Sequence, residues 1–513
     1  MLVKTFGSAV YGIEAITISI EVNVTLGTNT FMVGLPDNAV RESMLRVESA
    51  IKSNGYFMPR TKVIISLAPA DIRKSGSAFD LPIAIGILAA TDQLVNIASL
   101  NHYVLMGELG LTGSIQPIRG ALPIALTTLR ESFRGLVLPE TNANEAAVVN
   151  GLDVFGVNHL NEVVRLLEKP SESTPIHLST LDVFLNAQQE NVPDFQDVKG
   201  QEHIKRALEI AAAGGHNAIL IGPPGSGKTM LAKRLPSILP PLSLEEALET
   251  TRVHSVAGKL PDHSSLVSKR PFRNPHHTIS HMAMAGGGSM PQPGEISLAH
   301  NGVLFLDELP EFNRTVLEVM RQPMEERRLT ISRARMSLEF PASFMLIASM
   351  NPCPCGYFNH PLKSCCCPPG AVLKYLNKIS GPLMDRIDLH VEVTPVAFGD
   401  LQTAKQQESS GTVRQRVIAA RQLQAKRFSS FNGIYCNAQM TNQLLKEVCE
   451  LDNLSLQLVK KAMETLSLSA RAYERILKVS RTIADLEGKE KIYPEHLAEA
   501  IQYRSLDRET WGR

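Results

Sequence analysis

The hydrophobic pattern changes character along the chain. Residues 1–168 alternate β-rich segments with helical ones. From residue 194 to residue 393, short continuous apolar runs alternate with helical stretches. Such runs are typical of buried parallel strands, so this part predicts a doubly wound parallel sheet with its ligand at the carboxyl edge. The remaining sequence is helical, with helices predicted over 413–428, 442–450, 455–466, 470–486 and 494–503.

These changes divide the sequence into four segments. Residues 1–168 form a first domain without a nucleotide motif, and residues 169–193 form a linker whose Pro-, Ser- and Glu-rich start is typical of an exposed loop. Residues 194–398 form an α/β core, and residues 399–513 form an α-helical lid. We expect no long repeat and no low-complexity tract in this organisation.

A phosphate-binding loop follows the first apolar run of the core. Residues 219–221 lead directly into GPPGSGKT and then into a predicted helix. The glycines let successive backbone N–H groups face phosphates, and the helix adds the positive end of its dipole. Lys228 is expected to reach the β and γ phosphates, and Thr229 to hold Mg²⁺. The predicted nucleotide-binding residues are Gly222, Pro223, Pro224, Gly225, Ser226, Gly227, Lys228 and Thr229.

Two further apolar runs end in polar residues that ATP hydrolysis needs. Residues 303–306 end in Asp307 and Glu308, and residues 344–348 lead to Asn351. Asp307 is expected to hold Mg²⁺, and Glu308 to act as the general base on the attacking water. Asn351 is placed to orient that water. Paired acids that merely cap the next helix are the alternative, but their occurrence together with the phosphate-binding loop favours an ATPase site.

Three longer segments carry a resemblance to a known family. GEISLAHNGVLFLDELPEF at 294–312, SMNPCPCG at 349–356 and SGPLMDRIDLHV at 380–391 resemble the Mg-chelatase-like YifB/ComM family of AAA+ ATPases with an insert in helix 2. The resemblance extends over essentially the whole chain. It implies a hexameric ATP-dependent DNA helicase that moves single-stranded and branched DNA and promotes branch migration during natural transformation.

Composition agrees with a globular chain and excludes a bulk basic surface. The 513 residues are 44% hydrophobic and 20% charged with a net charge of +1, so nucleic-acid binding must come from local clusters. The first residues lack the pattern of a signal peptide, and no apolar stretch is long enough to span a membrane. We therefore expect a cytoplasmic protein.

The first domain resembles the proteolytic domain of Lon proteases. KSGSAFDLP at 74–82 and LMGELGLTGSIQPIR at 105–119 carry the similarity. Ser77 lies near the position of the Lon nucleophile, but residues 119–126 supply no lysine where the base should be. A Ser hydroxyl without a base stays protonated and weakly nucleophilic. We therefore expect a Lon-like α+β domain that is catalytically inactive and has a structural or DNA-guiding role.

Two arginines match residues that act on ATP in this family. Arg386 matches the arginine finger, which enters the neighbouring subunit's site and stabilises charge on the transferred phosphoryl group. The alternative is an ion pair with Asp385 or Asp388 inside one subunit. Arg471 resembles sensor 2, which reads the γ phosphate in cis or in trans, and Arg475 is the second candidate.

Five of the seven cysteines are crowded between residues 353 and 367. Pairs of the CxC type at this separation can close a tetrahedral zinc site, and the predicted ligands are Cys353, Cys355, Cys365 and Cys367. Reduced loop cysteines without metal are the alternative, because CxC is tighter than the usual CxxC. Cys436 and Cys449 are isolated and are expected in the core.

The DNA contacts are predicted from two segments. The stretch 269–288 resembles the pore-loop insert of this group, and residues 329–340 predict a β-hairpin. Solvated loop charges or a subunit interface explain the same residues equally well. The candidate phosphate contacts are Arg273, His276, His277, Arg333 and Arg335.

Two other functions compete with a DNA motor. A metal-insertion motor like magnesium chelatase shares the ATPase core, but its ATPase subunit is not preceded by a Lon-like domain. A protein-remodelling ATPase has the same architecture, because related ring motors move different polymers.

Overall fold

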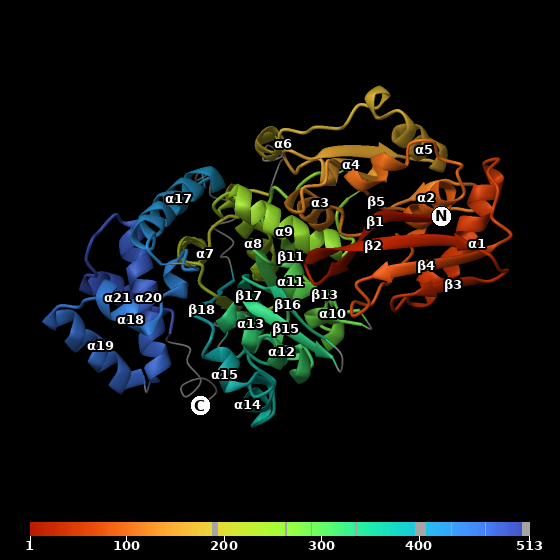
Figure 1. The fold of residues 1–513 in the computed structure, drawn as a ribbon. Helices are drawn as coiled ribbons and strands as arrows, with labels where there is room; N and C mark the ends of the chain where they lie inside the picture. The colour runs from red at the N-terminus through yellow and green to blue at the C-terminus, as the bar shows by residue number, and fades with distance from the viewer. Residues whose placement is uncertain are drawn as a thin grey trace.

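The computed structural model describes residues 1–186, 193–261, 264–288, 290–333, 336–358, 360, 362–395, 407–431, 433–466 and 468–504. Figure 1 shows an N-terminal sheet domain at one end, a central α/β region and a helical region at the other end. No helix among these residues is long and apolar enough to cross a membrane.

The N-terminal domain is built on a mixed sheet of seven strands in the order β3-β4-β2-β1-β5-β8-β9. A long antiparallel ladder between β1 and β2 forms its centre, and β5, β8 and β9 extend it in parallel. All residues of α2 are buried, which explains its nearly continuous apolar sequence. The strands are β1 (Leu2–Tyr11), β2 (Glu14–Thr25), β3 (Thr30–Val33), β4 (Lys62–Ala68), β5 (Tyr103–Leu105), β8 (Gly135–Pro139) and β9 (Asp153–Val157), and the helices are α1 (Asn38–Ser53), α2 (Asp80–Ala90), α3 (Ala121–Arg130), α4 (Glu140–Ala146) and α5 (Leu160–Glu168).

The central region holds the parallel sheet that the apolar runs predict. Its five strands lie in the order β11-β14-β17-β10-β18. Alternate residues of these strands enter two separate apolar clusters, one on each face of the sheet. Burial on both faces therefore explains why the runs are continuous. The strands are β10 (Ala218–Ile221), β11 (Phe272–Arg273), β14 (Val303–Leu306), β17 (Met345–Met350) and β18 (Leu389–Glu392).

Helices cover both faces of the central sheet. One face carries α7 (Glu202–Gly214), α8 (Lys228–Arg234) and the lid helices, because residues of all these elements join one apolar cluster. The other face carries α12 (Arg314–Val319), α13 (Arg321–Glu326), α14 (Ala371–Leu376) and α15 (Gly381–Met384). The lid helices are α17 (Ser410–Arg427), α18 (Asn442–Val448), α19 (Asn453–Leu466), α20 (Ala470–Leu486) and α21 (Pro494–Gln502). The predicted lid helices are confirmed, with ends that differ by a few residues.

A buried ionic network fixes the lid to the sheet. Asp388, which directly precedes β18, accepts the backbone N–H of Asn217 at 3.0 Å, and Arg475 Nη1 lies 3.0 Å from its other oxygen. His216 shares a hydrogen bond with the Thr482 hydroxyl of α20, and its other ring nitrogen lies 3.5 Å from Asp388. Burial alone would raise the pKa of Asp388, but Arg475 and His216 hold it well below its usual range. The lid therefore meets the sheet at the amino ends of its strands.

The segment after α5 is more ordered than its composition predicts. Ile176 bridges to Val154 of β9, and residues further on form α6 (Thr180–Asn186). Phe184 is buried against Val148 of the N-terminal domain and Leu242 of the core. The described part of the linker expected at 169–193 is therefore anchored to both domains through a few residues such as Phe184, whereas Leu181 and Leu185 are exposed.

The N-terminal domain contacts the core at two further places. Helix α3 packs against α9 (Leu244–Val256), and the Gly120 N–H donates to the Ser255 carbonyl at 3.3 Å. The Ser255 hydroxyl donates to Glu145, whose pKa is raised by burial. At the second place, Tyr11 and Ile13 of the β1–β2 turn pack against the hairpin formed by β15 (Arg328–Arg333) and β16 (Met336–Pro341).

Candidate functional site

The phosphate-binding loop connects β10 to α8 at the carboxyl edge of the central sheet. Gly225 and Gly227 have φ of 78° and 88°, the left-handed region that glycine adopts without strain. Lys228 Nζ folds back and donates to the carbonyls of Gly222 at 2.7 Å and Pro223 at 2.8 Å. Burial lowers the pKa of Lys228, while Asp307 and Glu308 act in the opposite direction. The ammonium group is thus held at the loop by backbone carbonyl acceptors that a phosphate oxygen can replace.

Asp307 lies beside this loop and is held from two sides. Thr229 Oγ1 donates to Asp307 Oδ2 at 2.8 Å, as expected for two residues that would share one magnesium ion. The Ser349 hydroxyl donates to the other carboxylate oxygen, which also accepts the Glu308 N–H at 3.1 Å. Ser349 is not among the residues that the sequence predicts for this site. Its only signal is a hydroxyl inside an otherwise apolar strand.

Glu308 adopts an unusual backbone conformation. Its φ of 56° and ψ of 50° are left-handed, which costs a non-glycine residue about 1 kcal/mol or more and is found at functional sites. The side chain is 56% exposed, so its carboxylate is accessible to a water molecule. His277 Nδ1 lies 3.8 Å from it. Asn351 completes the group, because its side-chain oxygen accepts from Lys228 at 3.3 Å.

The arginine expected as the finger and the first candidate for sensor 2 lie at the edge of the sheet opposite the phosphate-binding loop. The Arg386 guanidinium is only 10% exposed, donates to the Pro382 carbonyl and pairs with Glu325 of α13. Arg386 therefore forms its ion pair with Glu325, and not with Asp385 or Asp388, the two acids close to it in the sequence. Arg471 is 62% exposed at the start of α20, 3.9 Å from Asp385. Arg475, the second candidate for sensor 2, instead forms an ion pair with the buried Asp388.

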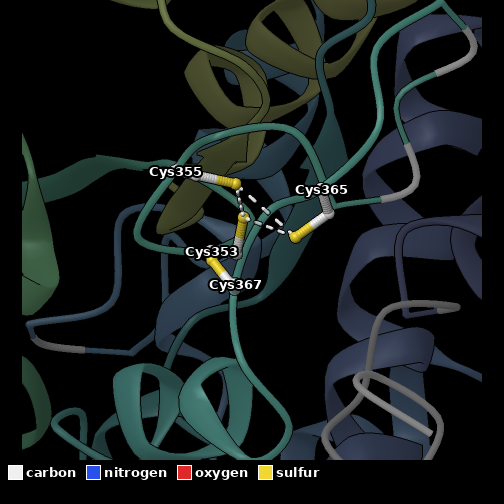
Figure 2. A group of neighbouring side chains, drawn as sticks. All are labelled: Cys353, Cys355, Cys365 and Cys367. Carbon is white, nitrogen blue, oxygen red and sulfur yellow. Dashed lines mark hydrogen bonds between the residues drawn. The ribbon is translucent and has the colours of Figure 1, made fainter.

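The predicted cysteine ligands come together in one cluster. Figure 2 shows the sulfurs of Cys353, Cys355 and Cys365 turned toward one another, with Cys367 beside them. The first three sulfurs are 3.3–3.7 Å apart, and all four lie within 4.8 Å of one another. Tetrahedral zinc with Zn–S bonds of about 2.3 Å separates its sulfurs by about 3.8 Å. The donor set and its spacing therefore fit a structural zinc ion. Cys366 is exposed, and Cys436 and Cys449 are buried, as expected.

Comparison with known proteins agrees with this geometry. The sequence matches three family descriptions: "Subunit ChlI of Mg-chelatase" over residues 20–142, "Magnesium chelatase, subunit ChlI" over 194–401 and "Magnesium chelatase, subunit ChlI C-terminal" over 407–504. It is 43% identical to Competence protein ComM of Haemophilus influenzae, over 99% of this chain and 98% of that protein. The chain belongs to the YifB/ComM family of magnesium chelatase-like AAA+ proteins.

Two further relatives match the chain over different lengths. The chain is 44% identical to protein YifB of Escherichia coli, over 98% of this chain and 96% of that protein. A shorter match of 159 residues, 32% identical, covers 28% of this chain and 27% of Lon protease 2 of Bacillus subtilis. The expected fold, a Lon-like domain followed by an AAA+ sheet and a helical lid, is confirmed, and the first domain also matches ChlI. Membership of an AAA+ family implies ATP and Mg²⁺, which the loop, Lys228, Thr229 and Asp307 fit.

The predicted DNA contacts do not lie in one group. Arg273 forms a bidentate pair with Glu295 at 2.6 and 2.7 Å, and His276 stacks on His277 with ring centroids 4.1 Å apart beside the nucleotide site. Arg333 is exposed near the end of β15, and Arg335 lies outside the described residues. Of the two described candidate arginines, Arg333 is therefore the exposed one, whereas Arg273 is half-buried.

Ser77 of the N-terminal domain donates a hydrogen bond to Glu108. Lys74, three residues earlier, is buried, and its Nζ donates to the Pro69 carbonyl. Burial lowers the pKa of Lys74. The Ser77 hydroxyl therefore faces a carboxylate, whereas the nearby lysine in the sequence is engaged by the backbone.

We expect Ser349→Ala to weaken the magnesium site. Removal of the hydroxyl takes one donor from Asp307, and a hydrogen bond to a charged group contributes about 1.5 kcal/mol or more, so half-saturating Mg²⁺ should rise roughly tenfold. A Mg²⁺ titration of ATP hydrolysis measures the change. The exposed Ser337→Ala serves as the control. An unchanged Mg²⁺ requirement would contradict this role of Ser349.

Proposed function

We propose that the chain is a ring-forming, hexameric ATPase that translocates on DNA and promotes branch migration of recombination intermediates. The observation that carries the ring is the separation of catalytic groups across one sheet. The phosphate-binding loop follows Ile221 at the carboxyl end of β10, whereas Arg386 and Asp388 precede β18, whose first residue pairs with Ala218 at the amino end. Four-residue strands separate these edges by on the order of 13 Å.

This separation favours catalysis between subunits. A guanidinium at the amino edge is too far away to reach a γ phosphate bound at the carboxyl edge of its own sheet. Arg386 and Arg471 lie close together, because Arg471 is 3.9 Å from Asp385, the residue directly before Arg386. We infer that both act in trans on the ATP of the next subunit, and that Arg386 leaves Glu325 when that interface forms.

The assignment predicts complementation between inactive subunits. Glu308→Gln should bind ATP but hydrolyse it about 10²–10⁴-fold more slowly, because an amide cannot accept the proton of water. Arg386→Ala should be inactive for lack of transition-state charge. A mixture of the two should regain activity, since some interfaces then combine an intact base with an intact finger.

The control uses two defects in the same half of the site. Lys228→Ala mixed with Glu308→Gln leaves every nucleotide site defective, so steady-state ATPase assays should show no recovery. Equal recovery in both mixtures, or normal hydrolysis by Arg386→Ala alone, would contradict catalysis in trans.

DNA as the polymer is supported by the placement of two elements. The expected insert at 269–288 contains α10 (His281–Ala285) and β12 (Gly286–Gly287), and β12 pairs with β13 (Gln292–Pro293). A Cβ at Gly287 would come within 3.0 Å of Arg333 Nη2, so the insert and the β15–β16 hairpin lie side by side. The name of the Haemophilus influenzae relative links that protein to competence. These observations favour a DNA-tracking surface formed by the insert and the hairpin.

Arg333→Ala should weaken DNA binding uniformly across sequences. Loss of one phosphate contact reduces the slope of log affinity against log salt by roughly 0.7 for single strands. Fluorescence anisotropy with a labelled oligonucleotide at several salt concentrations measures this slope. Arg328→Ala, at the base of the same hairpin and paired with Glu339, removes the same charge as a matched control. If wild-type protein neither binds DNA nor shows DNA-stimulated hydrolysis at low salt, a protein-remodelling or metal-chelatase-type motor replaces this proposal.

We further propose that Cys353, Cys355, Cys365 and Cys367 hold one zinc ion per subunit. Metal analysis of untagged protein purified without chelator should find about one zinc per chain, because four thiolates form a closed structural site. Cys353→Ser with Cys355→Ser should abolish it, whereas the exposed Cys366→Ser should retain it. Wild-type protein without zinc would refute the assignment.

A further inference from the structure

The cysteine loop, defined here as residues 353–367, begins directly behind the nucleotide site. It follows Asn351, whose side chain accepts from Lys228, and its first cysteine is fully buried. Cys353 belongs to the same apolar cluster as Ile221, Leu306 and Met350, the last residues of three adjacent strands. The loop is therefore anchored where these strands deliver the phosphate-binding loop, Asp307 and Asn351.

A glycine turn brings the loop into direct contact with the phosphate-binding loop. The Gly356 N–H donates to the Cys353 carbonyl at 3.0 Å, and the φ of Gly356 is 84°. A Cβ at this position would lie 2.5 Å from Cδ and 3.2 Å from Cγ of Pro224. The turn thus packs against Pro224 so closely that only glycine fits.

Pro224 follows the two carbonyl groups that hold Lys228. Those acceptors belong to Gly222 and Pro223, so a shift of Pro224 changes the backbone that positions the Lys228 ammonium. Two sulfurs of the cluster belong to the turn itself, because Cys353 and Cys355 both lie within the four residues that the Gly356 N–H closes. Cys365 reaches both of them across the loop at 3.7 and 3.5 Å and so holds the turn in place.

We propose that the cysteine loop is a positioning element of the nucleotide site, in which the bound metal clamps the Gly356 turn against Pro224 and so fixes the phosphate-binding loop. The inference rests on the proposed zinc and nucleotide sites, and goes beyond them by coupling the two. Metal binding supplies ordering energy that the short loop lacks by itself. Loss of the metal therefore weakens nucleotide binding although no cysteine touches the nucleotide.

The two glycines of this region allow a matched test. Gly356 and Gly370 have nearly equal left-handed φ angles of 84° and 80°, so alanine strains both backbones alike. At Gly370 a Cβ meets nothing within 4 Å, whereas at Gly356 it meets Pro224. In the full-length chain, Gly356→Ala should weaken equilibrium binding of a fluorescent, non-hydrolysable ATP analogue about tenfold, which corresponds to about 1.4 kcal/mol. Gly370→Ala should change it less than about twofold.

A double-mutant cycle assigns the effect to the contact itself. Pro224→Ala removes both ring atoms that the added Cβ would meet. Adding Gly356→Ala to Pro224→Ala should therefore cost much less affinity than adding it to the wild-type chain. Additive losses would overturn the proposal.

The role of the metal is tested by replacing Cys365 and Cys367, because these substitutions leave the sequence of the Gly356 turn unchanged. Cys365→Ser with Cys367→Ser should lose zinc by mass spectrometry and bind the ATP analogue as weakly as Gly356→Ala, and Cys366→Ser should match the wild-type chain in both measurements. If the zinc-free variant or Gly356→Ala binds the analogue as tightly as the wild-type chain, the coupling proposed here is overturned, while the proposed ATPase function is unaffected. If the wild-type chain itself does not bind the analogue, the proposed ATPase function fails and this inference fails with it.

Discussion

The arrangement of the molecule depends on the interactions of the buried Asp388 carboxylate with Arg475 and with the Asn217 N–H. Burying an ionised group without partners is prohibitively costly, so its cation and its hydrogen-bond donors must be in place whenever the core is folded. Those partners come from the residues directly before β10 and from lid helix α20. One desolvated charge thereby joins the lid to the sheet edge farthest from the nucleotide. The arginines proposed to act in trans lie at this same edge.

The sequence was sufficient where function depends on short, local patterns. The loop from Gly222 to Thr229, the acids after β14 and the helix over 470–486 all lie as the residues predict. Strand, loop and helix signals suffice there because the groups that act together are adjacent in sequence or end on neighbouring strands. The cysteine cluster belongs to the same class, since its two pairs lie on one loop.

Contacts between distant segments could not be predicted in this way. Arg386 pairs with Glu325 of another helix, while the neighbouring acids that sequence proximity favours bind Arg471 and Arg475. The one signal of Ser349, a single hydroxyl in a buried strand, does not separate a functional residue from an ordinary core residue. The segment after residue 169 looked like a linker by its Pro and Ser content, yet Phe184 is buried in a cluster built from three regions of the chain. Tertiary packing determined each of these outcomes, and local composition did not.

That shared cluster has a consequence for dissecting the protein. Phe184, Val148 and Leu242 come from the intervening segment, the N-terminal domain and the core, and Leu248 of α9 packs on the apolar interior of the N-terminal domain. A fragment cut at the apparent sequence boundary would carry part of this interior into water and would leave the buried Glu145 without Ser255. The two domains therefore match separate family descriptions, but they share a buried apolar cluster and depend on each other to keep it out of water. A recombinant ATPase core is best designed with its N-terminal neighbour retained, and aggregation of a shorter fragment would say nothing about its catalytic competence.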